Sequence, residues 1–106
     1  MGPKTAELID VLEELAILLE SDRDNHWSRW MRKAKTLLQA SDYSGITYLR
    51  SAYGGMGSFN DLVLGQSSED GVFFWKPGYK ELNDRLDGLR NKAAQLGAQI
   101  QRSQAE

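Results

Sequence analysis

The chain has 106 residues, of which 41% are hydrophobic and 26% are charged, a size and composition typical of a single globular domain. It contains no cysteine, which excludes a disulfide scaffold, a thiolate metal site and a thiol nucleophile. The longest unbroken apolar run, residues 15–19, is far shorter than the roughly 20 residues that span a bilayer. No secretory signal pattern is visible, so we expect a soluble cytoplasmic protein without membrane contact.

Charge is distributed unevenly beneath the net value of −2. Residues 1–24 hold seven acids and two bases, whereas residues 25–53 hold five bases and one acid. Two interpretations follow from this division. Either two neighbouring helices present complementary charged faces, or the acidic segment forms a surface that attracts a basic partner.

Residues 5–21 predict the first helix. Its apolar residues recur at spacings of three and four, which places them on one stripe, and Thr5 is suited to cap its first turn. The acids of this segment lie away from the stripe, or in the first turn where the helix dipole favours negative charge. Four of them form the candidate partner-binding surface: Glu7, Asp10, Glu13 and Glu14.

A second helix is predicted over residues 25–40. The polar turn before it, residues 22–25, is so short that the two helices should form an antiparallel hairpin. Trp27 and Trp30 lie on its apolar face, where each ring would bury on the order of 200 Å² if enclosed. We interpret them as core anchors, with a base-stacking or ligand-binding platform as the alternative.

The centre of the chain is a glycine-rich turn between helical segments. Residues 42–53 predict a third, shorter helix, which a glycine pair then ends. Ser58 and Asp61 match a capping box that opens a short helix over residues 58–64. The residues expected to form this turn and its cap are Gly54, Gly55, Gly57, Ser58 and Asp61.

The run Val72–Trp75 is apolar and aromatic, and glycine and proline residues bound it. This composition favours an extended segment over a helix, and because no second strand is evident we expect it to lie across the helices as a hydrophobic plug. The last helix is predicted over residues 79–102, with apolar residues at an average period of 3.5, which indicates a packing seam. We expect the seam to pack within the bundle, with homodimerisation as the competing use: Tyr79, Leu82, Leu86, Leu89, Ala93, Leu96 and Ile100.

The sequence lacks a recognisable catalytic or metal-binding constellation. His26 is the single histidine, and with Asp22 and Asp24 it makes only a weak set of metal ligands. The glycine-rich loop has neither the following lysine of a P-loop nor the preceding strand of a dinucleotide fingerprint. A cluster of bases in the second helix could contact nucleic acid, but the isoelectric point of about 5.4 argues against it. We therefore expect no enzyme activity, no cofactor, no metal and no nucleic-acid partner.

Residues 53–64, Tyr-Gly-Gly-Met-Gly-Ser-Phe-Asn-Asp-Leu-Val-Leu, resemble the signature of a family of small, largely uncharacterised bacterial proteins. The resemblance covers roughly residues 25–97. It implies a relation to immunity proteins, which are encoded beside antibacterial toxins and bind them in the cytoplasm, and it identifies no catalytic residue. Matching positions lie in the helix before the block and in the helix after it: Trp30, Leu37, Leu38, Asn83, Leu86, Leu89 and Arg90.

These observations predict one all-α domain over residues 1–106, a small bundle of about four helices with a long C-terminal helix. The expected function is that of a cytoplasmic immunity protein that binds a toxin through the acidic first helix and occludes its active site. The alternatives are a regulatory or structural module that homodimerises through its last helix, and an enzyme or small-ligand protein that uses the glycine loop. The expected core is Leu12, Leu15, Leu19, Trp30, Leu37, Leu49, Leu62, Phe74, Leu82, Leu86 and Leu89.

Overall fold

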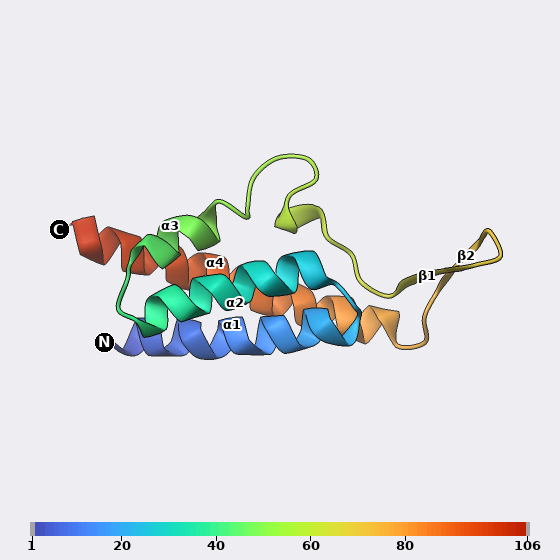
Figure 1. Ribbon diagram of the computed structural model, residues 1–106, viewed down its shortest axis with the longest axis horizontal. Helices are drawn as coiled ribbons and strands as arrows, with labels where there is room; N and C mark the ends of the chain where they lie inside the picture. The colour runs from blue at the N-terminus through green and yellow to red at the C-terminus, as the bar shows by residue number, and fades with distance from the viewer. Residues whose placement is uncertain (1, 106) are drawn as a thin grey trace.

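Three long helices form the body of the molecule: α1 (Pro3–Ser21), α2 (Asn25–Gln39) and α4 (Tyr79–Ala105) (Figure 1). The computed structural model describes residues 2–105. Helix α1 packs against both α2 and α4, and the short α3 (Ser44–Arg50) packs against α2 and α4. The molecule is elongated, 53 × 24 × 20 Å, with both ends of the chain at one end of the bundle (Figure 1). In the described part of the chain, no helix combines the length and the hydropathy that a membrane crossing requires.

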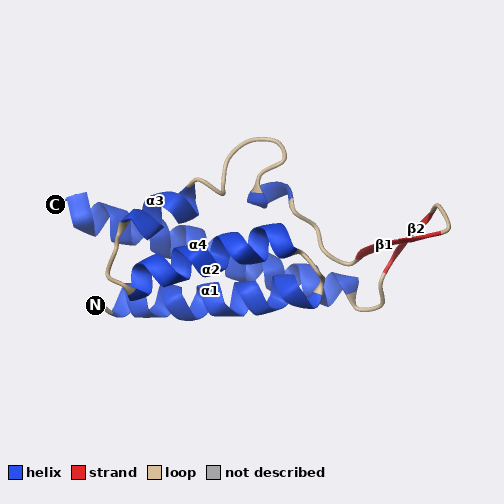
Figure 2. Cartoon of the chain, in the orientation of Figure 1, coloured by secondary structure: helices blue, strands red, loops and turns tan. Residues whose placement is uncertain are grey.

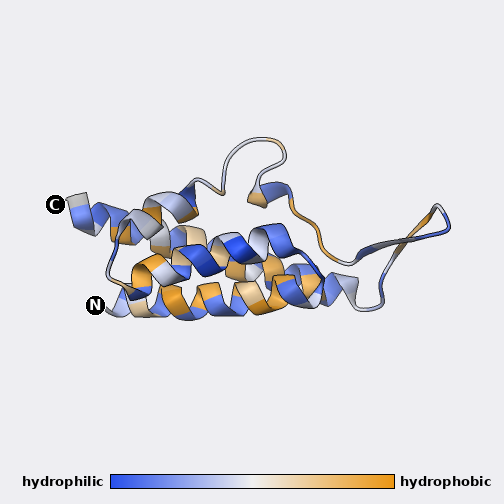
Figure 3. Cartoon of the chain, viewed as in Figure 1, coloured by the Kyte–Doolittle hydropathy of each residue, from blue (hydrophilic) through white to orange (hydrophobic). Residues whose placement is uncertain are grey.

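The core forms where the apolar stripes of the helices meet. Four leucines of α1 spaced by three or four residues (Leu8, Leu12, Leu15 and Leu19) are fully buried, as the helical period requires. The α4 seam faces inward too, and four of its members are buried within this chain: Leu86, Ala93, Leu96 and Ile100. Figure 3 shows the corresponding apolar colour along the helices.

The expected core residues divide into three groups. Five are buried in the structure: Leu12, Leu15, Leu19, Leu49 and Leu86. Five are half-buried: Trp30, Leu37, Leu62, Leu82 and Leu89. Phe74 is exposed, so its assignment to the core is wrong.

The expectation of an all-α domain is wrong, because the described residues also contain a two-stranded antiparallel sheet (Figure 2). Strand β1 (Gln66–Glu69) pairs with β2 (Val72–Trp75), with Glu69 opposite Val72. The two residues between the strands, Asp70 and Gly71, have φ angles of 51° and 79°. Positive φ at both central residues is the geometry of a type I′ turn, which is typical of Asp-Gly in a two-residue hairpin.

The hairpin also corrects the expected position of residues 72–75. This segment is extended, but it does not lie across the helices as a plug. The hairpin projects beyond the end of the bundle opposite the two termini (Figure 1), and all four residues of β2 are exposed. Residues 72–75 leave the bundle because they pair with a second strand, Gln66-Ser67-Ser68-Glu69. The sequence did not reveal this strand, because its residues are all polar and show no alternation with apolar ones.

The segment that joins α3 to the hairpin is less helical than the capping box at Ser58 and Asp61 predicted. Helix α3 ends at Arg50, and only one 3₁₀ turn, η1 (Phe59–Asp61), forms where a helix over residues 58–64 was expected. Leu62 is extended, with φ −66° and ψ 132°. The chain therefore leaves the turn in the direction of the hairpin.

Candidate functional site

The hairpin carries apolar side chains on both of its faces. Because side chains alternate along a strand, Phe73 and Trp75 share one face, and their rings pack edge to face with centroids 5.3 Å apart. Val72 and Phe74 lie on the other face. The exposed fractions are 64%, 55%, 39% and 40% for residues 72 to 75. Exposed apolar side chains that are gathered in one segment, rather than scattered singly, are typical of an interaction surface.

The base of the hairpin is fastened to the turn between α1 and α2. The carboxylate of Asp22 accepts a hydrogen bond from Gly65 N–H at 3.0 Å and another from Lys76 Nζ at 3.0 Å. Lys76 N–H in turn donates to Gly65 O at 2.7 Å, which continues the ladder below the strands. A two-stranded hairpin alone is marginally stable in water, so this anchor fixes its direction relative to the helices.

Gly65 allows the hairpin and α4 to approach closely. Its φ of +84° lies in the left-handed region. A Cβ at this position would lie 2.6 Å from Tyr79 Cβ, which is closer than real atoms come. The position therefore requires glycine both for its backbone angle and for the contact.

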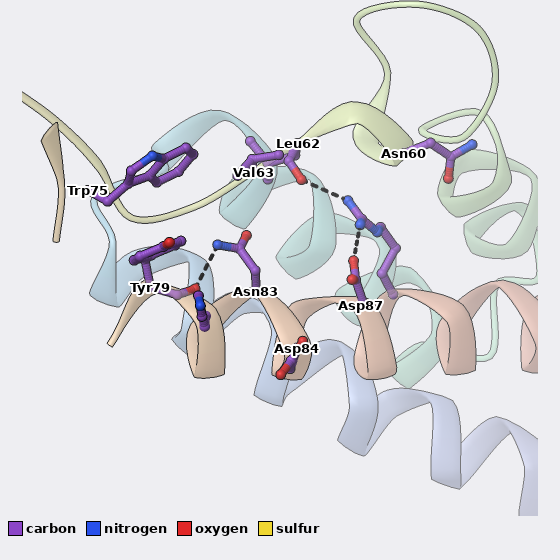
Figure 4. A pocket seen from close by; sticks show the side chains of 10 residues that line it. Asn60, Leu62, Val63, Trp75, Tyr79, Asn83, Asp84 and Asp87 are labelled. Carbon is purple, nitrogen blue, oxygen red and sulfur yellow. Dashed lines mark hydrogen bonds and ion pairs between the residues drawn. The ribbon is translucent and has the colours of Figure 1, made fainter. Parts of the chain in front are cut away.

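A groove of about 500 Å³ opens at the foot of the hairpin (Figure 4). The ring of Trp75 stacks on Tyr79 at one end of it, with centroids 4.8 Å apart and planes inclined by 22°. Leu62 and Val63 line the groove opposite α4, and Val63 is 46% exposed. The remaining lining residues come mostly from α4: Asn60, Lys80, Asn83, Asp84, Asp87 and Arg90.

Two α4 side chains in this groove hold the chain segment above it. Asn83 accepts a hydrogen bond from Leu64 N–H and donates to Leu64 O, both at 2.8 Å. Arg90 donates to Phe59 O at 2.8 Å and to Leu62 O at 3.0 Å, and it is paired with Asp87. These bonds satisfy backbone groups of Phe59, Leu62 and Leu64 and so support the wall of the groove. The side chains that line the groove include no nucleophile with a positioned base.

The predicted partner-binding acids do not form one free patch. Glu13 lies 3.1 Å from Arg32 and 2.6 Å from Lys35 on α2. The hydrogen bond from Lys35 is the main cause that lowers the pKa of Glu13. Glu7 lies 3.3 Å from Lys92 on α4.

The other two predicted acids stay in solvent. Asp10 and Glu14 are exposed on α1 and take part in no ion pair among residues 2–105. The acidic helix and the basic helix therefore neutralise part of each other's charge. This is the first of the two interpretations of the charge pattern, and it leaves Asp10 and Glu14 as the free part of the acidic surface.

Hydrogen bonds within the glycine-rich turn hold its conformation. Gly57 N–H donates to Asp61 Oδ2 at 2.8 Å, and Ser58 Oγ accepts from Asn60 N–H at 3.2 Å while it donates to Gly54 O at 3.2 Å. Gly54 and Gly57 have φ angles of 149° and 80°, which the turn requires. Gly55 O accepts from Ser58 N–H at 3.2 Å. The loop thus uses these amides internally rather than presenting them to an anion.

The tryptophans of α2 are likewise committed within the fold. Trp30 stacks on Tyr48 at 4.7 Å, and its indole N–H donates to Tyr48 O at 3.0 Å. Trp27 packs on the buried Phe59 at 5.2 Å. His26 is exposed beside Trp27, and among the residues that the structure describes no group of three potential ligands is placed to hold a metal ion.

The sequence did not reveal the hairpin and groove as a site. One signal was available, since Asp70-Gly71 before a β-forming run is a strong short-range sign of a hairpin. Asp22 and Val63 carried no such signal, because their roles depend on contacts between segments far apart in the chain.

Comparison with protein families identifies a match over half of the chain. The model of the family described as "Domain of unknown function (DUF6966)" matches residues 20–72, half of the chain. This range runs from the end of α1 through the glycine-rich turn to the first residue of β2. No curated protein and no solved structure matches the chain.

Proposed function

The chain belongs to the domain family of unknown function DUF6966, and we propose that it acts by binding another protein rather than by catalysing a reaction. The observation that carries this proposal is the hairpin, whose aromatic side chains lie on both faces and are exposed. A flat partner surface could cover only one of these faces. A cleft in the partner covers both, so the hairpin is suited to insertion.

The specific role that we propose is that of a cytoplasmic immunity protein, which neutralises a bacterial toxin by occluding its active site. The family resemblance of the glycine block is the reason for choosing a toxin. The projecting hairpin supports occlusion, because an active site is commonly a cleft. Acids on the same molecule, Asp10, Glu14, Glu69 and Asp70, would steer the chain to a basic surface around that cleft.

The alternative of a module that dimerises through α4 gains less support. Leu86, Ala93, Leu96 and Ile100 are at most 4% exposed within a single chain. A dimer through this seam would require them to leave the contacts they already make with the rest of the bundle. We therefore retain the hairpin as the surface to test.

The test is copurification with the product of the gene beside this one, together with protection of cells that express that product. The double variant Phe73→Ser/Phe74→Ser removes one ring from each face of the hairpin. Burying such a side chain contributes about 1.5–3 kcal/mol, so the dissociation constant should rise at least about 100-fold, with loss of protection. Ile17→Ser is the matched control, because Ile17 is an exposed apolar residue (52%) of α1 and not part of the hairpin.

Three results are informative. Binding lost in the hairpin variant and kept in Ile17→Ser supports the proposal. Wild-type affinity of the hairpin variant would exclude the hairpin as the contact surface. If the wild-type chain does not bind the toxin, the immunity role is wrong.

A second variant, Asp10→Asn/Glu14→Gln, tests the acidic surface, and it should slow association and reduce its dependence on salt.

A further inference from the structure

We propose that the outer edge of β2 is a strand-pairing site, and that its occupant is an extended segment of the partner that is both basic and apolar. This proposal rests on the proposed function, because it specifies how the hairpin engages the protein it binds. It concerns the main chain of the hairpin rather than its aromatic side chains. The register, the exposure and the charge of the hairpin carry it.

The register determines which backbone groups are free. In a two-residue hairpin the residues that flank the turn exchange hydrogen bonds, and such pairs then alternate with pairs that do not. Glu69 and Val72 flank the turn, so Ser68 and Phe73 form a pair without ladder bonds. The bond from Lys76 N–H to Gly65 O fits the same alternation. The N–H and C=O of Phe73 and Trp75 therefore point away from β1.

Within its own four residues, β2 lacks the devices that normally protect an edge strand. Natural edges carry charged residues, prolines or bulges, or another element covers them. Val72-Phe73-Phe74-Trp75 has no charge and no proline, and every residue in it is exposed. Its residues are also strong strand formers. A third strand would complete a sheet that is marginal with two.

Charge favours a basic occupant. The ten residues of the hairpin, 66–75, include Glu69 and Asp70 and no basic residue. The nearest base along the chain, Lys76, is already paired with Asp22. An incoming strand with lysine or arginine would be attracted by the two acids at the tip of the hairpin, and its apolar residues would cover the aromatic rings.

The edge on β2 is preferred over the edge on β1 for a physical reason. Strand β1 presents Gln66-Ser67-Ser68-Glu69, whose side chains offer little apolar area to a neighbouring strand. A strand added to β2 instead packs against aromatic and β-branched neighbours, which stabilise sheets most. The two edges therefore provide a comparison within one protein.

Proline substitutions on the two edges test the pairing directly. Phe73→Pro and Ser68→Pro each remove an outward N–H from directly opposite positions, and neither removes a bond between β1 and β2. Phe73→Ala controls for the lost ring while it keeps the N–H. Amide exchange and the ring-current shift of Trp75 on Tyr79 report whether the hairpin remains formed in each variant.

The probe is the acetylated and amidated peptide KVTIKV, titrated into the full chain and followed by NMR shifts of the indole and the backbone amide of Trp75, both of which every variant keeps. Its acidic counterpart EVTIEV serves as the charge control. We expect KVTIKV to bind with a dissociation constant at least tenfold below that of EVTIEV. Ser68→Pro and Phe73→Ala should retain binding, the latter with reduced affinity, and Phe73→Pro should abolish it.

Other outcomes overturn the proposal. Loss of binding in Ser68→Pro alone would move the pairing to β1, and equal affinities of the two peptides would remove the charge preference. No binding of either peptide, or equal behaviour of Phe73→Pro and Phe73→Ala, would exclude strand pairing. A dimer of the chain that Phe73→Pro dissociates would make a second copy the occupant. If strand pairing fails while Phe73→Ser/Phe74→Ser still abolishes toxin binding, the proposed function stands without this inference.

Discussion

Asp22 and Lys76 are 54 residues apart in the sequence, yet Asp22 Oδ1 and Lys76 Nζ lie 3.0 Å apart. One residue follows the end of α1 and the other follows the end of β2. The same carboxylate accepts the Gly65 N–H on the other side of the hairpin base. A single side chain therefore joins both legs of the hairpin to the helical bundle.

Removing this carboxylate should loosen the hairpin. Asp22→Ala leaves the Gly65 N–H without its partner, and an unsatisfied buried donor costs about 1–3 kcal/mol. Lys76→Met should cost only about 0–1 kcal/mol, because Lys76 is partly exposed and its ion pair is screened. Urea denaturation measures both values, and amide exchange of residues 66–75 shows the local effect. Equal losses in the two variants would contradict this role for the Gly65 bond.

Gly65 should tolerate no side chain. Gly65→Ala places a Cβ 2.6 Å from Tyr79 Cβ and also strains the backbone at φ +84°. The strain alone costs of order 1–3 kcal/mol, and the clash adds to it. Gly78→Ala is the matched control, because its φ is +80° and nothing lies within 4 Å of its added Cβ. The difference between the two free energies of unfolding measures the contact, and a difference of zero would mean that Tyr79 yields freely.

The ion pairs between α1 and α2 should appear in the titration of two glutamates. The pKa of Glu20 is lowered chiefly by its hydrogen bond with Arg32, whereas the pKa of Glu13 is lowered first by Lys35. Arg32→Gln should therefore return the pKa of Glu20 toward its ordinary value and leave that of Glu13 still lowered. Carbon NMR titration of the side-chain carboxyls measures both.

The sign of the pH effect follows from these shifts. Because both folded-state pKa values are lowered, the stability that the pairs contribute is present above about pH 4.5. It is lost as the pH falls through the folded-state pKa values. Arg32→Gln should flatten this acid dependence, while Arg29→Gln on the same helix should leave it unchanged. Equal pKa shifts of Glu13 and Glu20 in Arg32→Gln would contradict the division of roles.

Tyr53 should resist ionisation and support α4. Its hydroxyl donates to Arg90 O at 2.8 Å, and burial is the first cause that raises its pKa well above the usual range. A raised pKa means that the free energy of unfolding begins to fall as the pH rises above about 10, the ordinary value for tyrosine. Ultraviolet titration should show this tyrosine ionising after an ordinary one.

Tyr53→Phe provides the complementary measurement. It removes the hydrogen bond to Arg90 O and leaves the ring beside Phe59, whose centroid is 5.6 Å away. The loss should be about 1 kcal/mol, and the late-ionising signal should disappear. If that signal remains in the variant, another tyrosine carries it.

The helices were predictable because their burial is periodic. The spacing of Leu8, Leu12, Leu15 and Leu19 identified the inner face of α1 without any tertiary information. The strand β1 was not predictable in this way. The residues of β1 are polar and none is buried, so no apolar pattern could reveal Gln66-Ser67-Ser68-Glu69 as a strand. The turn Asp70-Gly71 was its only local sign. The assignment of Phe74 to the core failed because aromatic residues usually indicate burial, whereas Phe74 is exposed on the hairpin.

The candidate site was predictable only in its composition. Apolar residues at 72–75 and acids in α1 were visible, but their accessibility was not. Glu13 meets Arg32 and Lys35 because two helices pack side by side, and that packing removes it from the free surface. Asp22 lies 43 residues from Gly65, so no local pattern could connect them.

The exposed β2 strand also has a consequence for the chain before it meets a partner. Short, uncharged, strand-forming segments on a free edge promote aggregation, and natural proteins flank them with gatekeeper residues. Here Glu69 and Asp70 precede Val72–Trp75, and Lys76 and Pro77 follow it. The two acids would thus help both to select a basic strand and to keep unbound chains from stacking into fibrils.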